Sequence, residues 1–168
     1  MITIIIMIVS LLLDGLLTNY LPFLPNQLSL FTPSFTLISI FLIYPFYRKE
    51  KKKYFYTVFI LGFIYDLFYT NLLFYNAFIY LLLGLFISIV YKNLEISFFK
   101  NIIFLFCLIV LYECFYASLI CLFHLVPITF EKLYYKISHT LILNIIYGEI
   151  VYFIIKLIPS KFKKISIN

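Results

Sequence analysis

Four acidic side chains lie inside long apolar stretches, and they are the residues best placed to do chemistry. They are Asp14, Asp66, Glu113 and Glu149. Carboxyl groups in such surroundings can carry protons or cations across a membrane, join helices by hydrogen bonds, or form a docking site for another protein's helix. We expect each to be protonated, bonded to other polar groups, near an aqueous end of its helix, or paired with a partner.

Small and polar neighbours favour the bonding and docking roles for these acids. Gly62 lies one helical turn before Asp66, which would let another helix approach closely. Thr18 lies on the same helix face as Asp14. A proton or cation path is less favoured, because the sequence has no helix interrupted by Gly and Pro and no basic residue in the middle of a span.

The cysteines and histidines predict neither a metal site nor redox chemistry. Cys107, Cys114 and Cys121 are seven residues apart, so neighbouring positions on a helix would lie roughly 10 Å apart, too far for a shared ion or a disulfide. His124 and His139 are scattered near the ends of spans. The sequence has no nucleotide-binding loop, Ser-His-Asp set or HExxH motif. We therefore expect no metal, no cofactor and no enzymatic activity.

The composition is that of an integral membrane protein. Hydrophobic residues make up 65% of the 168 residues and charged residues 12%, whereas soluble domains have about 25% charged residues. The mean hydropathy is +1.10. A net charge of +6 would suggest nucleic acid as a partner of a soluble protein. In a membrane protein the distribution of the charge matters more, so we expect no nucleic-acid partner.

We predict a single all-α membrane domain over residues 1–168, folded as a compact bundle of six transmembrane helices. A helix from Tyr54 to Tyr91 would be almost twice as long as the hydrocarbon layer is thick, so this stretch must fold back on itself. The apolar N-terminal stretch is long enough to span and is interpreted as a retained helix. The predicted spans are residues 2–24, 29–47, 54–70, 73–91, 101–123 and 138–158, with a longer connection over 124–137.

The basic residues predict the orientation. With the N-terminus in the cytoplasm, nearly all of the thirteen Lys and Arg residues lie in cytoplasmic segments, and only Lys132 and Lys136 lie in outer loops. Both termini are then cytoplasmic. A cytoplasmic basic loop, which we expect to attract anionic lipid, contains Arg48, Lys49, Lys51, Lys52 and Lys53.

Tyrosines gather near the ends of the predicted spans. Tyr44, Tyr54, Tyr56 and Tyr134 are examples. Their rings suit the membrane interface, where we expect the hydroxyl groups to reach water.

Three segments resemble the MreD family. They are Leu12-Leu-Asp-Gly-Leu16 in the first span, Leu28-Ser-Leu-Phe-Thr-Pro33 at the start of the second, and Gly62-Phe-Ile-Tyr-Asp66 in the third. Their order, the size of the chain and the short basic loop before the third segment also fit. The family commonly has glycine in the turn after this aspartate, whereas residues 71–76 contain none.

The resemblance implies a non-enzymatic scaffold of the bacterial cell-elongation machinery that supports side-wall peptidoglycan synthesis and rod shape. It implies an MreC-like bitopic partner and, directly or indirectly, the MreB filament and a RodA-type glycosyltransferase with a class B penicillin-binding protein. It also implies a location in the bacterial cytoplasmic (inner) membrane. The candidate residues for partner binding or intramembrane polar contacts are Asp14, Gly62, Asp66, Glu113 and Glu149. Asp66 would support the surface that holds the partner's helix.

The resemblance also supplies an alternative. The MreD fold is expected to be similar to the substrate-binding subunits of energy-coupling-factor vitamin transporters, which also have six helices. Such a subunit usually has an Ala-x-x-x-Ala pattern in its first helix, and residues 4–14 contain no alanine. A small proton-coupled channel that uses the buried acids is a third possibility.

Overall fold

The computed structural model describes residues 2–20, 33–70, 72–91, 98–124 and 129–157. In these residues the chain forms six α-helices and one 3-10 helix, and no strand. The elements are α1 (Ile2–Tyr20), α2 (Phe35–Ile43), η3 (Tyr44–Tyr47), α3 (Lys51–Tyr69), α4 (Tyr75–Val90), α5 (Phe98–Leu122) and α6 (Phe130–Leu157).

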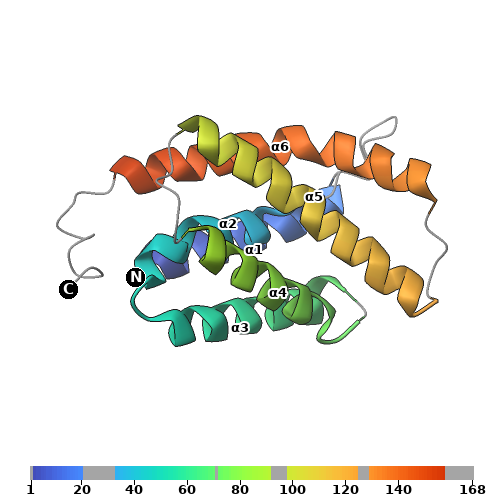
Figure 1. Cartoon of the computed structure of the whole chain (residues 1–168), viewed down its shortest axis with the longest axis horizontal. Coiled ribbons are helices and arrows are strands. Elements are labelled where there is room, and N and C mark those ends of the chain that lie inside the picture. The colour runs from blue at the N-terminus through green and yellow to red at the C-terminus, as the bar shows by residue number, and fades with distance from the viewer. Residues whose placement is uncertain (1, 21–32, 71, 92–97, 125–128, 158–168) are drawn as a thin grey trace.

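Consecutive helices pair as hairpins. The most extensive contacts are between α3 and α4, followed by α5 with α6 and α1 with α2. Figure 1 shows the first turn of α1 and the last turn of α6 at the same end of the molecule. An all-helical architecture is therefore confirmed.

Three helices are long and apolar enough to cross a membrane: α1, α5 and α6. The helical stretches Phe35–Tyr47 and Tyr75–Val90 are apolar but shorter. The α3 helix, which begins with three lysines and contains Asp66, is not among them. The structure thus supports membrane insertion, and the crossing of the membrane by all six helices remains a prediction.

The α2 helix forms the centre of the bundle. All nine of its residues are buried, and it packs against α1, α4 and α6. An uninterrupted apolar run favours this helix, and Pro45, at the start of η3, cannot continue its hydrogen-bond ladder. Phe35–Tyr47 would span only about 20 Å, less than the hydrocarbon layer, so α2 needs the other helices around it.

Two helix starts differ from the predictions by more than three residues. The α2 helix begins at Phe35, after Pro33, rather than before it, and the predicted start at residue 29 lies outside the described residues. The α6 helix begins at Phe130, so most of the predicted connection over 124–137 is helical. The charges of Glu131, Lys132 and Lys136 suggested a loop, but charged residues are compatible with a helix whose sides reach polar groups or water.

The turn between α3 and α4 depends on an unusual backbone conformation. Phe74 precedes α4 with φ 66°, in the left-handed region. Glycine adopts this region without strain, whereas other residues pay roughly 1–2 kcal/mol. Position 74 would therefore suit the glycine that the MreD family commonly has in this turn. Here Phe74 occupies the position and packs against Phe63, with ring centroids 5.1 Å apart.

Candidate functional site

Asp66 binds the start of the neighbouring helix α4. One carboxyl oxygen, Oδ1, accepts hydrogen bonds from the backbone N–H of Asn76 at 3.0 Å, its side-chain Nδ2 at 2.8 Å and the Thr70 hydroxyl at 3.0 Å. The other, Oδ2, accepts from the backbone N–H of Ala77 at 3.1 Å. The first N–H groups of a helix have no partner inside it, and Phe74 at the cap position provides none. Asp66 provides these acceptors from α3, so its two carboxyl oxygens bind four donors.

Gly62 lets α4 come close enough for these hydrogen bonds. A Cβ atom at Gly62 would lie 2.5 Å from Ala77 Cα, 2.8 Å from Ala77 N and 2.9 Å from Asn76 O. All three are backbone atoms of the α4 segment that binds Asp66. A side chain at position 62 would therefore push away the N–H groups that the carboxyl group binds.

Replacing Gly62 with alanine should destabilise the protein by about 1–3 kcal/mol, because the backbones of α3 and α4 must separate. Gly84→Ala is the matched control, since its Cβ would make ordinary contacts, the nearest at 3.5 Å to Tyr54 Cε1 and Val58 Cγ1. Thermal unfolding of the purified variants in mild detergent provides the comparison. Equal melting temperatures for the two variants would mean that the close approach at Gly62 is unimportant.

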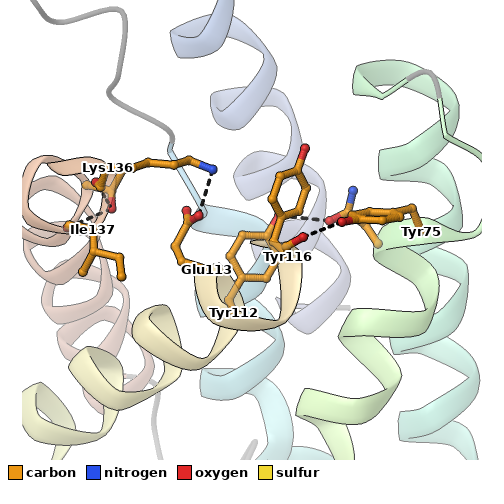
Figure 2. A network of polar contacts seen from close by, with 8 residues as sticks. Tyr75, Tyr112, Glu113, Tyr116, Lys136 and Ile137 are labelled. Carbon is orange, nitrogen blue, oxygen red and sulfur yellow. Dashed lines mark hydrogen bonds and ion pairs between the residues drawn. The ribbon is translucent and has the colours of Figure 1, made fainter. Parts of the chain in front are cut away.

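Hydrogen bonds extend from Asp66 to α5. The Tyr112 hydroxyl donates to Asn76 Oδ1 at 2.9 Å, and the Tyr75 hydroxyl donates to the Tyr116 carbonyl at 2.6 Å. Figure 2 shows Tyr75, Tyr112 and Tyr116 at this junction. Side chains from α3, α4 and α5 thus form one connected network.

Glu113 pairs with Lys136 across α5 and α6. Lys136 Nζ lies 2.8 Å from Glu113 Oε2 and 4.6 Å from the centroid of the Tyr116 ring (Figure 2). The Glu113 side chain is 1% exposed and that of Lys136 25% exposed. Of the alternatives expected for the acids, Glu113 is thus paired with a partner, and this partner is a basic residue. Lys136 was assigned to an outer loop, whereas it lies on α6, where its long side chain can reach inward.

Asp14 accepts hydrogen bonds from the first backbone N–H groups of α2. Its Oδ1 accepts from the backbone N–H of Phe35 at 2.7 Å, and its Oδ2 accepts from that of Thr36 at 2.8 Å. The adjacent N–H of Ser34 donates to Asn144 Oδ1 of α6 at 2.8 Å. These donors are buried, so α1 and α6 provide the acceptors that water provides for an exposed helix.

The suggested interaction of Thr18 with Asp14 has a different form. The Thr18 hydroxyl donates to the Asp14 backbone carbonyl at 2.7 Å, rather than to its carboxyl group. This bond stays within α1, so the carboxyl group of Asp14 is directed to α2.

Replacing Asp14 with alanine should cost about 2 kcal/mol, because two buried N–H groups at the start of α2 lose their acceptors. Thr18→Ala is the control, since it removes a hydroxyl from an exposed position of the same helix. Hydrogen exchange of the amides of residues 34–38, measured by mass spectrometry, should be faster in Asp14→Ala only. Unchanged exchange would contradict the capping role.

Glu149 lies toward the other end of the α5–α6 hairpin. Its Oε1 accepts a hydrogen bond from Asn101 Nδ2 at 2.7 Å. The structure thus distributes the four acids over separate contacts. Asp14, Asp66 and Glu113 lie in the second halves of α1, α3 and α5, and each binds the next helix of its own hairpin, whereas Glu149 lies late in α6.

The segment predicted as a basic loop follows η3, and its last three lysines form the first turn of α3. Arg48, Lys49, Lys51, Lys52 and Lys53 are all exposed. Lys53 Nζ lies 3.1 Å from Glu50 Oε2, with both side chains largely exposed. Such a surface pair contributes little stability, so the basic side chains remain accessible to solvent or lipid headgroups.

Tyrosine hydroxyl groups join helices at positions that the sequence assigned to the membrane interface. Tyr44 and Tyr54 are buried, and their hydroxyls donate to the carbonyls of Ser88 at 3.4 Å and Ile40 at 3.2 Å. The expectation that these hydroxyl groups reach water is therefore wrong for these two residues. Tyr56 and Tyr134, in contrast, are 71% and 70% exposed.

The residues whose contacts sequence reasoning missed are polar side chains that bind the acids directly, bind one of their partners, or, for Asn144, accept a hydrogen bond at the start of α2 beside Asp14. They are Asn76, Asn101, Tyr112, Lys136 and Asn144, and each stands out as a polar group near or within an apolar run. That signal marks candidates without indicating which helices are neighbours. The three cysteines are exposed on α5, and His139 Nδ1 lies 2.9 Å from the Tyr135 carbonyl. No cluster of metal-binding side chains occurs in the described ranges.

These features define a helical membrane protein whose acids in apolar helices bind its own helices. Residues 1–162 match the family described as rod shape-determining protein MreD. The chain therefore belongs to the MreD family of rod shape-determining membrane proteins. Neither the curated proteins nor the solved structures gave a match. The expected similarity to energy-coupling-factor subunits thus remains a prediction, and no comparison supports the vitamin-transport alternative.

Proposed function

We propose that this protein is a non-enzymatic scaffold subunit of the bacterial cell-elongation complex, which supports side-wall peptidoglycan synthesis by binding an MreC-like bitopic protein. The observation that carries the proposal is the family match over residues 1–162. The MreB filament and a RodA-type glycosyltransferase with a class B penicillin-binding protein join the same complex, directly or through that partner.

The intramembrane acids contribute to this role indirectly. Asp14, Asp66 and Glu113 each bind a group of this chain. In the proposed complex they fix the positions of the helices, and the partner's transmembrane helix binds the outward-facing side chains that those helices present. A change at Asp66 would then weaken partner binding by moving α3 relative to α4.

The proposal is tested by purifying the tagged protein from its native membranes in mild detergent and identifying the bound proteins by mass spectrometry. An MreC-like bitopic protein and wall-synthesis enzymes are expected. Glu131→Gln, which changes an exposed acid on α6, is a control that should retain them. Recovery of paired ATPases with a coupling subunit would contradict the proposal and indicate vitamin uptake.

The proposed location is the bacterial cytoplasmic membrane, with both termini in the cytoplasm. In a variant without native cysteines, Lys52→Cys should react with an impermeant maleimide only after the cells are opened. Lys132→Cys should react in intact cells, because residue 132 is predicted to lie outside. Labelling in the reverse order would show that the orientation is inverted.

A further inference from the structure

Asn101 and Glu149 leave two buried oxygen atoms without a donor. Asn101 lies in the first turn of α5 and is fully buried. Its Nδ2 donates to Glu149 Oε1 at 2.7 Å. The remaining oxygens of the same two groups, Asn101 Oδ1 and Glu149 Oε2, are buried and have no hydrogen-bond partner in the described part of the chain. A buried acceptor without a donor costs free energy, so the pair lacks a hydrogen atom.

One proton would satisfy both atoms. A protonated carboxyl group is a donor as well as an acceptor, so Glu149 Oε2–H could donate to Asn101 Oδ1 while Oε1 accepts from Nδ2. The neutral acid also avoids placing a charge among apolar helices. We propose that Glu149 is a protonation site, which holds a proton at neutral pH and forms a reciprocal carboxylic acid–amide pair with Asn101 that joins α5 to α6.

The described surroundings provide no cation to balance an ionised Glu149. No ion pair joins it to Lys100 of α5 or Lys156 of α6. The Tyr147 hydroxyl lies 2.6 Å from that of Ser10, and α2 has no ionisable residue. Among the remaining ionisable groups, Tyr152 lies on α6 itself, Cys107 lies farther along α5, and Tyr91 follows α4. Asp14 on α1 binds α2.

The α5–α6 hairpin thus has two acids with different kinds of partner. Glu113 is paired with a lysine at one end, and Glu149 is paired with an amide toward the other. Removal of the proton from Glu149 would leave its charge facing the Asn101 oxygen with one donor between the two side chains. The contact should therefore weaken as the pH rises, and by the predicted orientation it would respond to the cytoplasmic side.

Infrared difference spectra of the full-length protein in lipid nanodiscs test the protonation directly. At neutral pH, the spectrum of wild type minus Glu149→Gln should contain the C=O band of a protonated carboxyl group. Asn101→Ala should shift this band, because the partner of the acid is removed. A carboxylate band in place of the acid band, or an acid band that does not change in Asn101→Ala, would overturn the proposal.

Thermal unfolding is the second readout. Glu149→Gln should unfold like the wild type, because its amide donates to Asn101 Oδ1 and its oxygen accepts from Nδ2. Glu149→Ala should lower Tm by on the order of 3 °C. From neutral to alkaline pH, Tm should fall for the wild type and for the control Glu131→Gln more than for Glu149→Gln. Equal losses in Glu149→Gln and Glu149→Ala, or equal pH dependence in all variants, would overturn the proposal.

Discussion

Replacing Asp66 with leucine should destabilise the protein by on the order of 4 kcal/mol or more. Leucine accepts no hydrogen bond, so the backbone N–H groups of Asn76 and Ala77 and the Asn76 amide lose their acceptor. The Thr70 hydroxyl can still donate to the backbone carbonyls of residues 66 and 72. Each buried donor left unpaired costs about 1–3 kcal/mol, although relaxation would reduce the sum. The expected result is a large fall in the amount of folded protein, measured by size-exclusion chromatography after heating in detergent.

Asp66→Asn distinguishes the charge from the shape of the side chain. Asparagine has one acceptor oxygen, so its NH₂ group must face either the Ala77 N–H or the donors that bind Oδ1. We expect a loss of about 1–3 kcal/mol. Leu67→Ala, at the next and exposed position, is the control. An Asp66→Asn variant as stable as the wild type would show that the second acceptor oxygen of Asp66 adds no stability.

Replacing Lys136 with methionine should cost about 3–5 kcal/mol, because the buried Glu113 carboxylate loses its cation. Methionine preserves most of the length of the side chain, so the effect reports mainly the charge. Lys132→Met, at an exposed position of α6, is the control. Unfolding temperatures in detergent provide the measurement.

The double variant Glu113→Leu with Lys136→Met completes the test. A buried ion pair can often be replaced by apolar residues at little cost, whereas removal of one partner is expensive. The double variant should therefore be more stable than Lys136→Met alone. Additive losses would show that Glu113 and Lys136 act independently.

The sequence was sufficient to predict the helical class and the approximate helix positions, because apolar runs and the breaks between them are local features. It failed where a charge has a partner on another helix. Lys136 was predicted to lie in a loop because its charge is costly in lipid, and only the packing of α6 on α5 reveals that Glu113 offsets this cost. The start of α2 was placed before Pro33 because proline is tolerated in the first turn of a helix, whereas the helix begins two residues after it.

The candidate site could be predicted in part. The sequence identified Asp14, Asp66, Glu113 and Glu149 as unusual, since a carboxyl group in an apolar run is visible without a structure. It could not show that Asp14 and Asp66 bind the first N–H groups of α2 and α4, because these contacts depend on which helix end lies beside which carboxyl group. For the same reason, the sequence could not show that Glu113 pairs with Lys136 whereas Glu149 pairs with Asn101.

The two acceptors at the start of α2 also have a consequence for the order of assembly. Asp14 is synthesised before α2, whereas Asn144, which accepts the Ser34 N–H, is synthesised long after it. During translation, α2 can therefore bind α1 early, but its first N–H group stays without its native acceptor until the last helix has entered the membrane. A nascent chain that ends before residue 144 lacks the acceptor of the Ser34 N–H group. The native packing around α2 can therefore form only after α6 has been synthesised and inserted.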